Sequence, residues 1–123
     1  MKISCGVDLI EIDRVKKSIE NTNKFTEEIF TEKEIEYCES KKASKYQHYA
    51  ARFAAKEATF KAISRFLKNK TDISWKNMQV VNEKDGKPNI EFIGISFPQI
   101  KSIDISISHS KGNAIALVTI LYD

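Results

Sequence analysis

The sequence predicts an α+β fold for residues 1–123: a single small domain with an N-terminal strand, several helices including a long central helix, and a C-terminal antiparallel sheet. Three observations carry this prediction. Apolar residues alternate at the N-terminus, recur at helical spacing through the middle of the chain, and alternate again in short runs after Trp75. A length of 123 residues, with no repeat and no low-complexity linker, suits one hydrophobic core.

The N-terminal strand is predicted from a period of two. Asp8 has the opposite parity from the apolar residues around it, so its side chain should point away from their row. The apolar row comprises Ile3, Cys5, Val7 and Leu9. Asp13 is a candidate N-cap for the next helix, in which Val15 and Ile19 stand four residues apart and basic side chains occupy the exposed side.

Two short helices and one long helix are predicted in the middle of the chain. Phe25 and Ile29 have helical spacing. Thr31 and Glu34 have the T-x-x-E spacing of a capping box, which starts a further helix. Residues 43–67 contain neither Pro nor Gly and form the predicted central helix. Small side chains on it let another element or a ligand approach closely, and these are the alanines at positions 50, 51, 54, 55, 58 and 62.

The C-terminal part of the chain should consist of two antiparallel hairpins. Asp85-Gly86 is a strong turn signal between β-like runs at 78–82 and 90–95. A turn at 111–113 joins alternating residues at 103–109 to a last apolar run. These hairpins form the predicted antiparallel sheet.

Composition excludes several classes of protein. No apolar run approaches the roughly 20 residues that cross a bilayer, so we expect no membrane association. The first residues lack a signal-peptide pattern, which predicts a cytoplasmic location. Cys5 and Cys38 are too few for a disulfide framework and should both be reduced. A formal charge of +3, from 20 basic and 17 acidic residues, permits several kinds of anionic partner.

Two carboxylates stand out as candidates for chemistry. Asp8 is costly to bury unless a cation or a donor meets it, although it could instead cap a turn at the end of its strand. Glu57 and Lys61 share a helix face and could form an ordinary surface ion pair, but Phe53 on that face places Glu57 near the buried side. Together, Asp8 and Glu57 would form an incomplete magnesium site that needs phosphate oxygens.

Basic residues near these carboxylates would suit a phosphate ligand. Lys61, with Arg52 and Lys56 from earlier helical turns, could bind phosphate oxygens. His109 ends a predicted strand, where it could be a half-exposed rim residue, an anion ligand or a proton carrier. The common nucleotide-binding and hydrolase motifs are absent. The residues alone therefore leave the reaction open.

Three segments, which occur in this order along the chain, together indicate a particular reaction. They are Gly6–Arg14, Arg52–Ala58 followed by Lys61-Ala62, and Ile107–Ser110, supported by Phe30-Thr31 with Glu34, Tyr37 and Cys38, and by Gly86-Lys87-Pro88. In these segments the chain resembles the holo-acyl-carrier-protein synthases, a family of phosphopantetheinyl transferases, over nearly its full length. The resemblance implies transfer of the 4′-phosphopantetheine group from coenzyme A to a serine of apo acyl carrier protein. The products would be holo carrier and adenosine 3′,5′-bisphosphate, in support of fatty acid biosynthesis.

The resemblance also implies a cofactor, a co-substrate and roles for residues. Asp8 and Glu57 match the magnesium ligands of the family, and Lys61 matches a lysine that reaches the phosphates or the attacking hydroxyl, so these three are the expected catalytic residues. Coenzyme A is the implied co-substrate. The positions that match its binding residues, chiefly for its nucleotide end, are Arg52, Lys61, Pro88, His109 and Ser110.

Partners follow from the same resemblance. The basic region that meets the acidic carrier protein is matched by Arg14, with Lys17 and Lys24 as further candidates. The family is typically a homotrimer with each active site between two subunits. The chain departs from the family pattern at Ile63-Ser64-Arg65-Phe66, where a glycine-containing turn is usual. This departure leaves open the end of the central helix and one wall of the coenzyme A pocket.

Two other interpretations compete with a transferase. A nucleic-acid-binding module would use the many lysines, but these are scattered among acidic residues and no RNA- or DNA-binding motif accompanies them. We therefore expect no nucleic-acid partner. A family member that had lost the reaction would act only as an interaction protein, and the presence of Asp8, Glu57, Lys61 and His109 argues against this.

Overall fold

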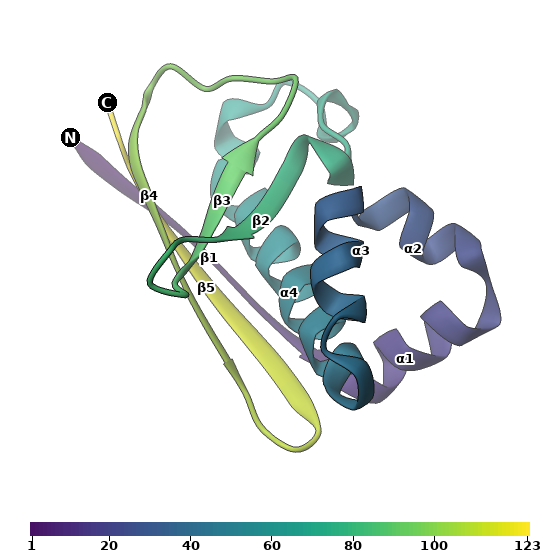
Figure 1. Cartoon of the computed structure of the whole chain (residues 1–123). Helices are drawn as coiled ribbons and strands as arrows, with labels where there is room; N and C mark the ends of the chain where they lie inside the picture. The colour runs from purple at the N-terminus through teal and green to yellow at the C-terminus, as the bar shows by residue number, and fades with distance from the viewer.

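The computed structural model describes residues 1–123 and confirms the α+β fold class. Its main elements are β1 (Lys2–Glu11), α1 (Ile12–Asn21), α2 (Asn23–Ile29), α3 (Glu32–Glu39), α4 (Lys45–Ile63), β2 (Met78–Asn82), β3 (Pro88–Phe92), β4 (Ile100–His109) and β5 (Asn113–Tyr122). Short 3-10 turns occupy Lys42–Ser44, Ser64–Phe66, Lys70–Asp72 and Trp75–Asn77. All four α-helices lie to one side of the long strands (Figure 1).

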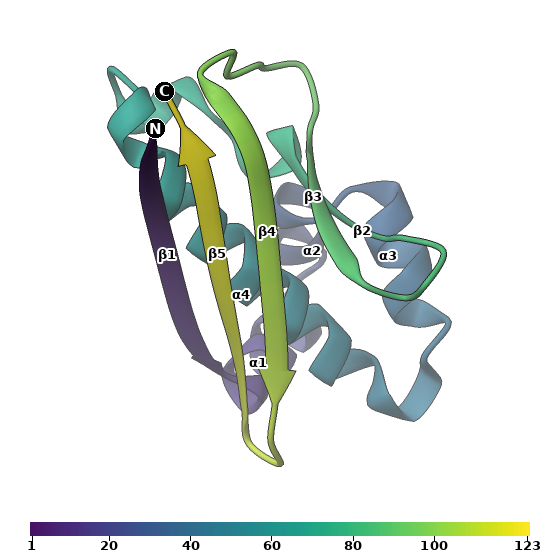
Figure 2. The same ribbon diagram turned by 90° about the vertical axis from the view of Figure 1, so that its left-hand side faces the viewer.

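The two ends of the chain form one sheet. β1 pairs antiparallel with β5, and β5 pairs antiparallel with β4, which gives the order β1-β5-β4. β2 and β3 form a separate two-stranded antiparallel sheet. Figure 2 shows the outer face of the larger sheet, with α4 behind it. The antiparallel hairpins predicted from the sequence are confirmed, but they belong to two sheets, and the N-terminal strand completes the larger one.

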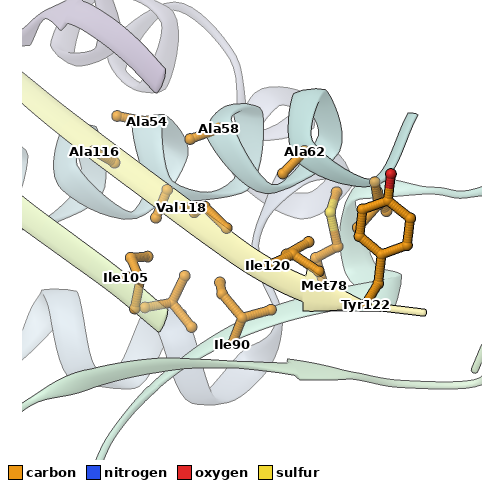
Figure 3. Packing of buried hydrophobic residues seen from close by; sticks show 13 residues of the cluster. Ala54, Ala58, Ala62, Met78, Ile90, Ile105, Ala116, Val118, Ile120 and Tyr122 are labelled. Carbon is orange, nitrogen blue, oxygen red and sulfur yellow. The ribbon is translucent and has the colours of Figure 1, made fainter. Parts of the chain in front are cut away.

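The inner face of this sheet packs closely against α4. Ala54, Ala58 and Ala62 of the helix are fully buried and point toward apolar side chains of β5 (Figure 3). Gly6 of β1 lies against the same helix, and a Cβ atom there would fall 1.9 Å from the Ala58 carbonyl oxygen. Any side chain at residue 6 would push β1 away from α4. The close approach predicted from the alanines is therefore made by the backbone of the sheet.

The capping box predicted at the start of α3 is present. Thr31 Oγ1 accepts a hydrogen bond from the Glu34 backbone N–H, and Glu34 Oε1 accepts one from the Thr31 N–H at 2.9 Å. Glu34 Oε2 accepts a second backbone hydrogen bond, from the Val80 N–H in β2 at 2.8 Å. The same carboxylate pairs with the buried ammonium of Lys56 in α4 at 2.6 Å. One carboxylate thus joins α3, α4 and β2.

The start of α1 differs from the prediction. Asp13 is not the N-cap, because the helix begins at Ile12 and Glu11 takes the cap position without a side-chain hydrogen bond. The Ile12 N–H donates instead to the Gly112 carbonyl at 3.0 Å. β1 runs directly into the helix beside the β4–β5 turn. The backbone of this turn therefore accepts the hydrogen bond of a helix N-terminal N–H that a capping side chain would otherwise accept.

The end of α4 is also earlier than predicted. The helix ends at Ile63, and the chain then tightens into the 3-10 turn Ser64–Phe66. The Phe66 ring packs edge-on against Tyr122, with centroids 4.9 Å apart, and Arg65 donates a hydrogen bond to the Tyr122 hydroxyl. Arg65 and Phe66, in the segment where the resemblance implies a glycine-containing turn, therefore connect the end of α4 to β5.

The outer face of the larger sheet is apolar and exposed. It carries most of the apolar row predicted on β1, together with two residues of β5, and we call these five residues the outer sheet face: Ile3, Val7, Leu9, Ile115 and Leu117, which are 40–65% exposed. Asp8 points away from this apolar row, as predicted, and it faces α4. No helix is long and apolar enough to span a membrane. Both cysteines are free thiols, and Cys38 is buried.

Candidate active site

Asp8 and Lys61 meet where β1 crosses α4. Asp8 lies within β1, opposite Ala116 of β5. Lys61 Nζ is 3.2 Å from Asp8 Oδ1 and donates a hydrogen bond to the Val7 carbonyl at 3.0 Å. The Asp8 side chain is 16% exposed and the Lys61 side chain 52% exposed. The ion pair is therefore open to solvent on the side of the lysine.

Glu57 supplies a second carboxylate to this site. Burial raises its pKa above the ordinary value of 4.5, the charge of Asp8 raises the pKa further, and Lys61 opposes this rise. Glu57 and Lys61 do not form the surface ion pair that their spacing allows, because Lys61 pairs with Asp8. Asp8 does not cap a turn at the end of its strand, because it lies within β1. We call the three expected catalytic residues, Asp8, Glu57 and Lys61, the metal group.

The metal group fits a hard cation that brings other ligands with it. Two carboxylates that repel each other would both be stabilised by a cation placed near them. The chain contains no cluster of three His, Cys, Asp or Glu side chains that could hold a metal ion. Asp8 and Glu57 alone would leave coordination positions for phosphate oxygens and water, which is how Mg²⁺ binds at phosphate-transfer sites.

Glu57 borders two cavities. One, of about 300 Å³, lies between α4 and the segment before β2, and its apolar wall includes Phe60, Trp75 and Met78. The other, of about 350 Å³, lies among β1, α1, α2 and α4 and is also bordered by Asp8. The carboxylate of Glu57 can therefore be approached from both sides of its helix.

The expected carrier-binding residues differ in their distance from this site. Arg14 of α1 lines the same cavity as Asp8 and Glu57. Lys17 forms an exposed ion pair with Asp13 at 3.0 Å and does not line that cavity. Lys24 is exposed near the start of α2. Of the three candidates, only Arg14 therefore lines a cavity that Asp8 and Glu57 also border.

Arg52 and Lys56, both candidates for binding phosphate near the metal group, make their contacts with other parts of the chain. Lys56 is wrong for this role, because its side chain is fully buried against Glu34. Arg52 makes no hydrogen bond or ion pair with the metal group and instead donates from Nη2 to Asn82 Oδ1 at 2.5 Å. Asn82 is the antiparallel partner of Pro88. Arg52 and Pro88 are therefore joined through the β2–β3 hairpin.

His109 and Ser110 lie at the turn between β4 and β5. They line a cavity of about 150 Å³ together with Leu9 and Ile115 of the outer sheet face. Positive charge gathers near this end of β4: the pKa of His48 is lowered by burial first and then by Lys41, Arg52 and His109. We call the expected coenzyme A residues other than Lys61 the nucleotide group: Arg52, Pro88, His109 and Ser110.

Sequence reasoning missed the contacts of Arg52. The Tyr37 ring lies 3.8 Å from its Cζ atom, and Asn82 is the only hydrogen-bond acceptor of its guanidinium. The sequence singles out Tyr37 only through the resemblance to the family. The position of Asn82, a few residues before the Asp85-Gly86 turn, carries no chemical pattern that would have identified it.

Known proteins resemble this chain over nearly its full length. Residues 4–118 match the model of the 4′-phosphopantetheinyl transferase superfamily. A holo-[acyl-carrier-protein] synthase of Ruminiclostridium cellulolyticum is 42% identical over 126 residues, which cover 98% of this chain and 92% of the relative. A holo-[acyl-carrier-protein] synthase of Clostridium tetani is 44% identical over 123 residues, with 94% and 93% covered.

A solved structure agrees with these sequence matches. The crystal structure of a Bacillus anthracis holo-(acyl-carrier-protein) synthase in complex with CoA (3′,5′-ADP) is 34% identical, has a TM-score of 0.80, and is matched over 98% of this chain and 96% of its own. The chain belongs to the 4′-phosphopantetheinyl transferase superfamily. Within it, the resemblance to the holo-acyl-carrier-protein synthases is confirmed.

Proposed function

We propose that this chain transfers the 4′-phosphopantetheine group of coenzyme A to a serine of apo acyl carrier protein, as a magnesium-dependent holo-acyl-carrier-protein synthase. The products are holo carrier and adenosine 3′,5′-bisphosphate. The reaction supports fatty acid biosynthesis in the cytoplasm, and residues 1–123 act as one transferase domain. The observation that carries the proposal is the meeting of Asp8, Glu57 and Lys61 in a chain whose relatives are named for this activity.

The metal group would act by positioning and by neutralising charge. Asp8 and Glu57 would hold Mg²⁺, which when bound neutralises the pyrophosphate of coenzyme A. Phosphoryl transfer needs little covalent help from a protein and much electrostatic stabilisation. Lys61 suits this because its ammonium is held only by Asp8 and the Val7 carbonyl. It can turn toward a phosphate oxygen or the attacking serine hydroxyl without breaking a buried network.

The nucleotide group would hold the nucleotide end of coenzyme A in a homotrimer with each active site between two subunits. Three observations support this arrangement. Within one chain, no hydrogen bond or ion pair joins Arg52 to the metal group. His109 and Ser110 line a cavity beside the outer sheet face. That face exposes contiguous apolar side chains of the kind that subunit interfaces cover.

The reaction is tested by weighing an apo acyl carrier protein after incubation with the chain, coenzyme A and Mg²⁺. We expect the carrier to gain the mass of one phosphopantetheine, and we expect EDTA to prevent the gain. No gain, under conditions in which a known synthase modifies the same carrier, would refute the transferase activity.

The placement of the site between subunits is tested by mixing two variants. Glu57→Gln damages the metal group and Arg52→Ala the nucleotide group, so each variant alone should be inactive. After subunits exchange, about a quarter of the sites in a mixed trimer should combine two intact groups. Recovered activity supports a shared site, whereas a mixture as inactive as its parts contradicts it.

The basic residues of α1 and α2 would bind the acidic carrier protein, with Arg14 nearest the metal group. Arg14→Ala should raise KM for the carrier roughly tenfold, and more at low salt, while coenzyme A binding stays nearly unchanged. Lys17→Ala is a matched comparison and should have a smaller effect, because Lys17 is already paired with Asp13. Equal losses of carrier and coenzyme A binding in Arg14→Ala would place Arg14 in the pocket or the fold instead.

A further inference from the structure

Arg52 is a buried cation without a carboxylate partner. It is 4% exposed, and none of the six ion pairs of the chain includes it. Its Nε atom is enclosed and has no hydrogen-bond partner. Glu34, whose charge reaches Arg52, is already bound by the Lys56 ammonium and by two backbone N–H groups. A buried charge left unpaired is costly, which points to an anion that arrives from outside the chain.

Two side chains hold the guanidinium of Arg52 in place. Tyr37 lies against it, with 3.8 Å between the ring centroid and Cζ. Asn82 Oδ1 accepts the hydrogen bond from Nη2 at 2.5 Å. Asn82 also donates from Nδ2 to the Gly86 carbonyl at 3.0 Å, in the turn before Pro88. Asn82 therefore fixes Arg52 relative to the β2–β3 hairpin, which carries Pro88 of the nucleotide group.

We propose that Asn82 is a positioning residue for the phosphate of coenzyme A that binds Arg52. This inference rests on the proposed function and extends it, because Asn82 was not among the residues expected to bind coenzyme A. Asn82 is exposed, so a ligand from solvent can meet the amide that accepts a hydrogen bond from the buried Arg52.

The neutrality of the amide is what suits Asn82 to this role. An amide oxygen orients the guanidinium and leaves its charge available to a phosphate. A carboxylate at the same position would pair with Arg52 and repel the phosphate. The charged side chains whose effects converge on nearby His48 are Lys41, Arg52 and His109, all of which favour an anion when protonated.

Binding of adenosine 3′,5′-bisphosphate to the full chain, measured by calorimetry without metal or carrier, tests the inference. Asn82→Ala and Asn82→Asp are a matched pair, because both lose the donor to Gly86 and only aspartate keeps the acceptor for Arg52. Asn82→Ala should weaken binding about fivefold, through loss of a hydrogen bond to a charged group. Asn82→Asp should weaken it about tenfold more, because its charge repels the phosphates.

The thermal stability of the two variants should not follow their affinity for the bisphosphate. This difference separates a positioning role of Asn82 from a merely structural one. Without ligand, Asn82→Asp should unfold at the same temperature as Asn82→Ala or a higher one, because aspartate gives the buried Arg52 a counter-charge. In turnover, Asn82→Ala should raise KM for coenzyme A and leave kcat within about twofold of the wild type. Asn21→Ala, an exposed substitution in α1, should bind the bisphosphate as the wild type does.

The inference is overturned if Asn82→Asp binds the bisphosphate as tightly as Asn82→Ala. A negative charge beside Arg52 would then have no effect on the affinity for the phosphates. Wild-type affinity in Asn82→Ala would also overturn it. A wild-type chain that binds neither the bisphosphate nor coenzyme A would instead overturn the proposed function on which the inference rests.

Discussion

Two lysines of α4 form ion pairs of opposite kinds. Lys56 Nζ lies 2.6 Å from Glu34 Oε1, and both side chains are fully buried. The same ammonium donates to the Ile29 carbonyl at 2.5 Å and to the Trp75 carbonyl at 3.2 Å. Burial lowers the pKa of Lys56, and the carboxylate of Glu34 opposes this shift. All three N–H groups of the ammonium are thereby used within the fold.

Lys61, five residues later, is held much less tightly. It is 52% exposed, and its partners are Asp8 at 3.2 Å and the Val7 carbonyl at 3.0 Å. The comparison teaches that residue type and helical position do not distinguish a lysine that is bound within the fold from one that is free to meet a substrate. Burial and the number of internal acceptors do, because only a lysine with few internal partners can give them up for a substrate.

The largest effect that this difference predicts is a loss of stability in Lys56→Met. The substitution leaves the Glu34 carboxylate buried without its cation, which should lower the free energy of unfolding by about 3–5 kcal/mol. Chemical denaturation measures this loss. A change below about 1 kcal/mol, as for a surface pair, would show that Lys56 does not have the structural role assigned to it.

A double substitution provides the control for this prediction. Lys56→Met combined with Glu34→Gln leaves no buried charge, so it should be more stable than the sum of the two single losses implies. Strict additivity of the two losses would mean that the pair is not coupled.

The next largest effect is on activity, in Lys61→Met. Because Lys61 is half-exposed and the pair is open to solvent on its side, the free energy of unfolding should change by less than about 1 kcal/mol. Transfer to the carrier should slow about 100-fold or more, since a charge that stabilises the transition state is lost. Lys61→Arg keeps the charge and should retain part of the rate. Wild-type turnover in Lys61→Met would remove Lys61 from the metal group.

The smallest expected effect is a pH-dependent gain of stability in Glu57→Gln without metal. A raised pKa means that the folded chain binds this proton more tightly than the unfolded chain does, so ionised Glu57 costs stability as the pH rises from 4.5 through the raised pKa. In EDTA at neutral pH, the variant should therefore unfold at a slightly higher denaturant concentration than the wild type. The difference should vanish below pH 4.5, and a less stable variant at neutral pH would contradict the repulsion between Glu57 and Asp8.

Local features of the fold were predictable from the sequence, and long-range ones were not. The capping box at Thr31 and the Asp85-Gly86 turn depend on neighbouring residues, so short patterns identify them. Alternation on β1 predicted which side chains share a face, but not that the apolar side would be exposed, because that depends on the distant helix α4. Asp13 failed as a cap for the same reason: the Gly112 carbonyl, far along the chain, replaced it.

In the candidate site, too, local relations between residues were predictable and long-range contacts were not. Helical spacing alone placed Glu57 and Lys61 together, whereas the pairing of Asp8 with them was supported only by the family resemblance. The burial of Lys56 could not be predicted, because Glu34 reaches it from another helix. Asn82 was missed because its role depends entirely on a contact with Arg52, 30 residues away in the chain.

The most direct test of the metal group is the rate at which Glu57→Gln adds phosphopantetheine mass to an apo carrier, beside the wild type at saturating Mg²⁺ and coenzyme A. We expect a folded variant whose rate is lower by about 100-fold or more, because one of the two carboxylates proposed to hold the cation has become neutral. A folded Glu57→Gln that modifies the carrier as fast as the wild type would contradict the assignment of the site.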